Sequence, residues 1–183
     1  MFQRQAINYA QLIKENLTDK EIFNLSASLK LFPTPFKGIY YVPSNEEKRG
    51  WFIDKPLSVI TKATELFLST NKFYFSCSTS EEFFGINWKP KEELHIVNEK
   101  RSGRIDLLER IPRNQRKKTY RAKKIAIILS FYGHELIFHR VKSITGAKFK
   151  ESPFGRFALK SQIKKDRKGS RKKVDFLFLC FDC

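Results

Sequence analysis

The chain has few of the residues that cross-link small secreted proteins. Its 183 residues include three cysteines, Cys77, Cys180 and Cys183, which are too few and too unevenly spaced for a disulfide framework. No stretch approaches the roughly 18 consecutive apolar residues that a membrane crossing needs, and no signal-peptide run follows Met1. We therefore expect a cytoplasmic protein that does not insert into a membrane.

The sequence also lacks the common signatures of enzymes. It shows no recognisable Ser/His/Asp set and no glycine-rich phosphate loop. A metal-dependent nuclease needs two or more acids that converge on one cation. The acidic pairs at 81–82, 92–93 and 106/109 are more typical of helix starts and surface charges. We expect no enzymatic activity and keep a metal-dependent nuclease as the weakest alternative.

Charge is distributed very unevenly along the chain. Residues 1–109 carry 15 Lys and Arg against 14 Asp and Glu, a net charge of +1, whereas residues 110–183 carry 21 against 5, a net charge of +16. Such a polycationic part favours a polyanionic partner, with nucleic acid ahead of a membrane surface. The 41% share of apolar residues, with 18 Phe, nevertheless indicates a folded chain.

Residues 1–43 have the outline of a small winged-helix-like DNA-binding unit. Apolar residues three and four positions apart predict a helix over 5–17, and a second helical stripe runs from a cap at Thr18 to Pro33. The aromatic run 36–43 then predicts a short β-ribbon, the wing. The hypothesis requires helices first, because a front that began with a strand would remove the winged-helix argument.

The second of these helices carries the candidate base contacts. Small polar and basic side chains on its polar face can reach base edges, and a lysine at the wing tip can meet a phosphate. An ordinary solvent-exposed helix face is the alternative. The candidates in the front unit are Asn24, Ser28, Lys30 and Lys37.

A larger mixed α/β domain is expected over residues 51–160, after a polar linker at 44–50. The predicted fold class is α+β. The domain's expected elements are a helix over 56–69, a strand over 73–77, a short helix from a capping box at Thr79 to Gly85, a strand over 93–97, and a hairpin of strands over 125–131 and 135–141.

Residues 110–124 contain eight basic residues and no acid, the densest candidate surface for phosphate. Phosphate contact by such side chains releases counterions and makes binding strongly salt dependent. A solvated loop is the alternative. The candidates here are Arg113, Arg116, Lys117, Lys118, Tyr120, Arg121, Lys123 and Lys124. Residues 161–183 are expected to form a basic tail, either ordered or disordered.

A zinc site is the one metal centre that the spacing suggests. Cys180 and Cys183 are separated by two residues, as in thiolate pairs that bind zinc, and His134 with His139 would have to complete the site. The two histidines flank a predicted strand five positions apart, so they should project to opposite faces. We expect no metal and no cofactor.

Two blocks resemble the AbiE-type antitoxins of abortive-infection systems. The run Gly38-Ile39-Tyr40-Tyr41-Val42-Pro43 resembles the wing end of that family. The second block, 73–97, resembles the opening of its second domain through Phe73-Tyr74-Phe75, Phe83-Phe84-Gly85 and, after Pro90, Leu94-His95-Ile96-Val97. The resemblance covers residues 36–105 and continues weakly through Phe138–Lys142.

This resemblance implies a winged-helix transcriptional regulator. Such a protein binds DNA at its own operon, neutralises a nucleotidyltransferase-like toxin through its second domain, and has no enzyme activity. The chain departs from the pattern in two places: its front is shorter than the usual three helices and wing, and the family's later Glu-Arg/Lys-Thr-Leu-Leu-Asp stretch is absent as such. If 174–179 is a remnant of that stretch, the tail is truncated or shifted. The alternative is a protein that binds RNA or DNA without sequence specificity.

Overall fold

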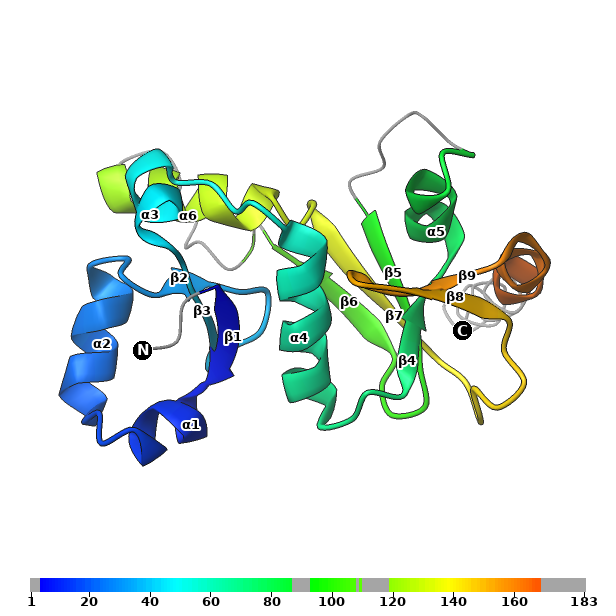
Figure 1. Ribbon diagram of the computed structural model, residues 1–183, viewed down its shortest axis with the longest axis horizontal. Coiled ribbons are helices and arrows are strands. Elements are labelled where there is room, and N and C mark those ends of the chain that lie inside the picture. Colours follow the sequence, from blue (N-terminus) through cyan, green and yellow to red (C-terminus); the bar gives the residue numbers. More distant parts are fainter. Residues whose placement is uncertain (1–3, 87–92, 108, 110–118, 169–183) are drawn as a thin grey trace, which may run out of the picture. The chain divides into compact units, whose positions relative to one another are not determined.

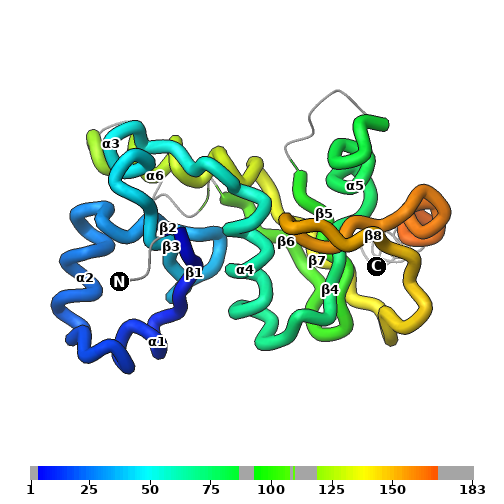
Figure 2. Tube along the Cα trace, viewed as in Figure 1, coloured from blue at the N-terminus to red at the C-terminus, as the bar shows by residue number. Residues whose placement is uncertain are grey.

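The computed structural model describes residues 4–86, 93–107, 109 and 119–168. It confirms the α+β class, because helices are combined with two separate sheets (Figure 1, Figure 2). The chain divides into two compact units: unit 1 comprises Met1–Asn71 and Ile105–Leu136, and unit 2 comprises Lys72–Arg104 and Ile137–Cys183. These units do not coincide with the expected segments 1–43 and 51–160.

Unit 1 begins with a strand. The order is β1 (Gln5–Asn8), α1 (Tyr9–Lys14), α2 (Asp19–Ala27), β2 (Phe32–Pro33) and β3 (Ile39–Val42), and the strands form an antiparallel sheet in the order β1-β3-β2. The expected helix over 5–17 is therefore wrong at its start. Ala6 and Ile7 are both buried in β1, and Asn8 with Gln11 forms a capping box that starts α1 only at Tyr9.

The small sheet of unit 1 is covered on both faces. Ile7 joins Leu12 and Ile22 in one cluster of buried side chains, against which Tyr40 and Val42 of β3 pack. Helices α1 and α2 therefore cover this face. Helix α4 (Pro56–Leu68) packs against β1 and β3, and α6 (Tyr120–Ser130) packs against β2. Figure 1 shows α1 and α2 on the opposite side of this sheet from α4.

Two segments of unit 1 that were expected to be a linker and a strand are helices, because each begins with a helix-capping residue. The stretch 44–50 is α3 (Asn45–Gly50) rather than a linker, since Ser44 caps it in a capping box with the fully buried Glu47. The run 125–131 lies largely in α6 rather than in a strand. Thr119 caps that helix, and a short apolar run is compatible with either structure.

Unit 2 is built around a sheet with the strand order β6-β7-β5-β4-β9-β8. Its buried centre includes Phe75 and Phe157, whose rings stack at 5.2 Å. The strands are β4 (Phe73–Phe75), β5 (Glu93–Asn98), β6 (Gly103–Asp106), β7 (Glu135–Arg140), β8 (Phe149–Ser152) and β9 (Gly155–Ala158). The unit boundaries fall within β6 and β7.

Two helical segments complete the described part of unit 2. Helix α5 (Cys77–Phe83) starts two residues before the capping box expected at Thr79, although Gly85 does follow its end with φ +65. A further helix runs over 160–168, within the first part of the expected tail, and residues 169–183 lie outside the described residues. Among the described helices, none has the length and apolar character required to cross a bilayer.

Candidate nucleic-acid interface and a cysteine–histidine cluster

Helix α2 exposes a mixed polar and aromatic face. Thr18 begins the helix through a capping box with Glu21, as the Thr18 cap predicted. Asn24 is exposed, and the neighbouring Phe23 is 70% exposed. Asn24 and Phe23 therefore give α2 a surface suited to hydrogen bonding and apolar contact with base edges.

Ser28 and Lys30 lie beyond the last residue of this helix. Helix α2 ends at Ala27, and the hydroxyl of Ser28 donates a hydrogen bond back to the carbonyl of Asn24 at 2.7 Å. Lys30 follows the helix and lines a mostly apolar cavity of about 490 Å³, together with Leu25 and Leu31. The expected recognition face is thus shorter than the sequence indicated.

The β2–β3 connection is a packed turn that exposes one lysine. The Thr34 hydroxyl donates to the Ile39 carbonyl at 2.7 Å, and Phe36 stacks on Phe67 of α4 at 4.4 Å. Gly38, at φ +76, completes the turn in a conformation that favours glycine. Lys37 remains exposed at the tip, where the sequence placed it.

The start of α6 combines basic and aromatic side chains. Arg121 and Lys123 are exposed, and Tyr120 is 74% exposed. Lys124 is held differently, because its Nζ lies 3.4 Å from the ring centre of Trp51 and 4.0 Å from that of Tyr120. We infer that Arg121 and Lys123 can reach a phosphate while Lys124 anchors α6 to Trp51.

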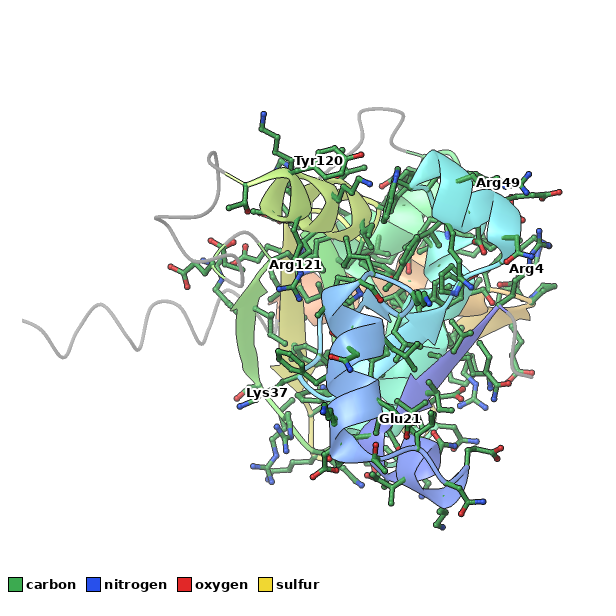
Figure 3. The ribbon with its side chains drawn as sticks, turned by 90° about the vertical axis from the view of Figure 1, so that its left-hand side faces the viewer. Arg4, Glu21, Lys37, Arg49, Tyr120 and Arg121 are labelled. Carbon is green, nitrogen blue, oxygen red and sulfur yellow. The ribbon has the colours of Figure 1, made fainter. Side chains whose placement is uncertain are left out.

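These candidates belong to one unit but to different elements. In Figure 3, α2 faces the viewer, Lys37 and Arg121 lie to its left, and Tyr120 lies above them. The remaining candidates of the basic run, Arg113, Arg116, Lys117 and Lys118, lie outside the described residues, as do Cys180 and Cys183 of the expected zinc motif.

A buried carboxylate on α3 connects that helix to β3 and to the chain on either side of the helix. Glu47 accepts hydrogen bonds from the Ser44 amide at 2.7 Å, the Asp54 amide at 3.0 Å and the Tyr41 hydroxyl at 2.8 Å. Burial alone would raise the pKa of Glu47, but these hydrogen bonds outweigh it and lower the pKa below its usual value. Burial together with this carboxylate raises the pKa of the Tyr41 hydroxyl.

Unit 2 contains a cluster that the sequence analysis missed. Cys77 at the start of α5, His95 on β5 and His139 on β7 each offer a ligand atom, and these atoms lie within 4.8 Å of one another. The His95 Nδ1 and His139 Nε2 atoms are 2.9 Å apart, with the rings stacked at 5.2 Å. The Glu93 carboxylate lies 3.3 Å from the other ring nitrogen of His95.

Thr79 connects two of the three elements that carry this cluster, α5 and β5. Its hydroxyl accepts from the His95 amide at 2.8 Å and donates to the Glu93 carbonyl at 3.4 Å, which connects α5 to β5. The spacing in the sequence instead suggested a zinc site made of His139, His134 and the two terminal cysteines. The only available signal for the observed cluster was that Glu93 and His95 must share a strand face.

Comparison of the chain with models of known protein families, with curated proteins and with solved structures found no match.

Proposed function

We propose that this chain is a cytoplasmic DNA-binding transcriptional regulator of the AbiE-antitoxin type, in which unit 1 binds operator DNA. The observation that carries the proposal is the connectivity of the front. A helix pair, α1–α2, leads into the β2–β3 hairpin, and α2 exposes Asn24 and Phe23 on its surface. A helix pair followed by a ribbon is how winged-helix proteins present a recognition helix and a wing.

The strand-first start removes the winged-helix argument in the form that the sequence required, because that form needed helices first. What remains is a helix pair and a hairpin inside a three-stranded sheet, in which β1 pairs with β3 along its whole length, from Gln5 opposite Val42 to Asn8 opposite Ile39. The strand adds an edge to the wing sheet and leaves the helix pair and the hairpin in sequence. We therefore keep the hypothesis in modified form, with α2 as the recognition helix.

Charge at the start of α6 supports a phosphate-binding role for this helix, in addition to the role proposed for α2. Arg121 and Lys123 occupy the first turn, where no acid is present. Positive side chains there oppose the helix dipole, and a bound phosphate would relieve this repulsion. Residues that weaken their own helix are more readily explained by a ligand than by folding.

A sequence-tolerant RNA- or DNA-binding protein is the second candidate. The observation that favours it is the net charge of +16 on residues 110–183, since charge alone supplies non-specific affinity. A metal-dependent nuclease is the third and weakest candidate. The proposed toxin partner, a nucleotidyltransferase-like protein bound through unit 2, rests on the family resemblance alone.

Footprinting of the purified chain on the region upstream of its own gene tests the proposal. Protection confined to one site supports a regulator, whereas uniform protection that fades with salt supports the second candidate. Cleavage that requires a divalent metal would support the third. Co-purification of a nucleotidyltransferase with the tagged chain would support the toxin partner. If the two proteins are expressed in the same cells and do not co-purify, that result would argue against the partner.

A further inference from the structure

We propose that Cys77, His95 and His139 form a zinc-binding site in unit 2, in which Glu93 orients His95 and the fourth position is open to water or an external ligand. The three ligand atoms already lie within 4.8 Å of one another. This inference is independent of DNA binding, because it rests only on residues of unit 2.

The donor set selects the class of metal. One sulfur and two imidazole nitrogens suit borderline ions such as Zn²⁺, whereas Mg²⁺ and Ca²⁺ require oxygen ligands. Zinc sites with three protein ligands keep a fourth position for water or substrate. The cluster is therefore better suited to zinc than to the divalent ions of most nucleases.

The separation of the two histidine nitrogens is close to that in a zinc site. With Zn–N bonds of about 2.0–2.1 Å in tetrahedral geometry, two bound nitrogens lie roughly 3.3 Å apart. The observed distance between His95 Nδ1 and His139 Nε2 is 2.9 Å, so the two rings need to open by only a few tenths of an ångström. The side chain of His95 is 14% exposed, which shields the site while leaving it accessible to an ion.

Glu93 favours the tautomer that metal binding requires. Its carboxylate lies 3.3 Å from His95 Nε2 and so favours a proton on that nitrogen. Nδ1 then presents its lone pair toward His139. A carboxylate behind a ligating histidine in this way raises the basicity of the ligand and fixes its ring.

The backbone of Cys77 adopts an uncommon left-handed conformation. Cys77 has φ +52, a conformation in which a residue other than glycine is strained, and strain of this kind is concentrated at functional sites. Burial raises the pKa of the Cys77 thiol, which argues against a thiolate nucleophile in the metal-free protein. A bound metal ion would displace the thiol proton and take the sulfur as a ligand.

Cobalt titration of the purified, reduced full-length chain tests the site. One equivalent of Co²⁺ should produce the thiolate-to-cobalt charge-transfer absorption together with the intense visible bands of a tetrahedral complex, and Zn²⁺ should abolish both. Cys77→Ala should remove the charge-transfer absorption. The matched control is Cys180→Ser with Cys183→Ser, which should retain it. Glu93→Gln should weaken cobalt affinity by about 10–100-fold.

Two results would overturn the proposal. One is the absence of stoichiometric binding by the wild-type chain. The other is absorption that survives Cys77→Ala but is lost in the double variant of Cys180 and Cys183, which would place the metal at the chain terminus. Circular dichroism checks that each variant is folded. If Cys77→Ala does not fold, His139→Gln replaces it, and unchanged cobalt affinity in that variant would equally refute the site.

Discussion

Removal of the Glu47 carboxylate should destabilise the chain strongly. In Glu47→Ala, the Tyr41 hydroxyl and the Ser44 amide lose their acceptor in a buried environment, while the exposed Asp54 regains water. An orphaned buried donor costs about 1–3 kcal/mol. Two such donors cost roughly 2–6 kcal/mol, and relief from burying a charge offsets part of this. We expect the free energy of unfolding to fall by about 3 kcal/mol.

Glu46→Ala is the matched control, because Glu46 is adjacent and its side chain is 79% exposed, with one long ion pair to Arg4 at 3.7 Å. We expect this change to cost less than about 0.5 kcal/mol. Urea unfolding followed by circular dichroism and tryptophan fluorescence measures both variants. Equal unfolding midpoints for Glu46→Ala and Glu47→Ala would refute the argument, since the buried hydrogen bonds of Glu47 would then contribute nothing.

The same carboxylate predicts a pH dependence. Although burial opposes it, hydrogen bonding lowers the folded-state pKa of Glu47 below the unfolded value of about 4.3. The stability that ionised Glu47 contributes is therefore present above about pH 4.3 and lost as the pH falls through the folded pKa. The stability difference between wild type and Glu47→Gln should be largest near neutral pH and shrink below about pH 4. A difference that stays constant from pH 7 to pH 3 would contradict this.

Three further predictions concern unit 1. Arg121→Gln with Lys123→Gln should reduce the slope of log affinity against log salt by about 1.8 for duplex DNA, because two phosphate contacts are lost. The control Lys62→Gln, which removes a charge already paired with Glu65 on α4, should leave the slope unchanged. In the same binding assay, Asn24→Ala should weaken binding to the native duplex by roughly tenfold and hardly affect a scrambled one. By urea unfolding, Asn8→Ala should cost about 1 kcal/mol, because it removes the capping box of α1.

Local signals in the sequence predicted several elements of the fold well. The cap at Thr18 identified the start of α2, and Pro56 identified the start of α4. Runs of aromatic and β-branched residues located β3 and β4, and the alternation over 93–97 located β5. In each case, the residues that determine the element lie within it or directly beside it, so no distant contact was needed to identify it.

The errors arose where burial depends on the rest of the chain. The spacing of Ala6 and Ile7 fitted a helical stripe, but in the structure both residues are buried on opposite faces of a strand. That burial depends on β3 and α4, which come later in the chain and which the local pattern does not contain. The run from Ile125 matched a buried strand, since a short apolar run does not by itself distinguish helix from strand. Thr119, which caps α6 in the structure, is the sequence signal that would have distinguished the two.

The cysteine–histidine cluster was beyond sequence reasoning for a topological reason. His95 and His139 are 44 positions apart and meet because β7 lies beside β5 in the sheet. Cys77 joins them through the junction between β4 and α5. Strand order is set by the whole fold, so a pairwise spacing rule instead directed attention to Cys180 and Cys183.

Binding of the full-length chain to two labelled duplexes, one from the region upstream of its own gene and one scrambled, tests the central claim most directly. Each duplex is titrated across a salt series. The account predicts a preference of roughly a hundredfold or more for the native duplex that persists as salt rises, because base and shape readout survive screening. Equal affinities that fade together would contradict it, and would leave only a basic surface that binds nucleic acid without regard to sequence.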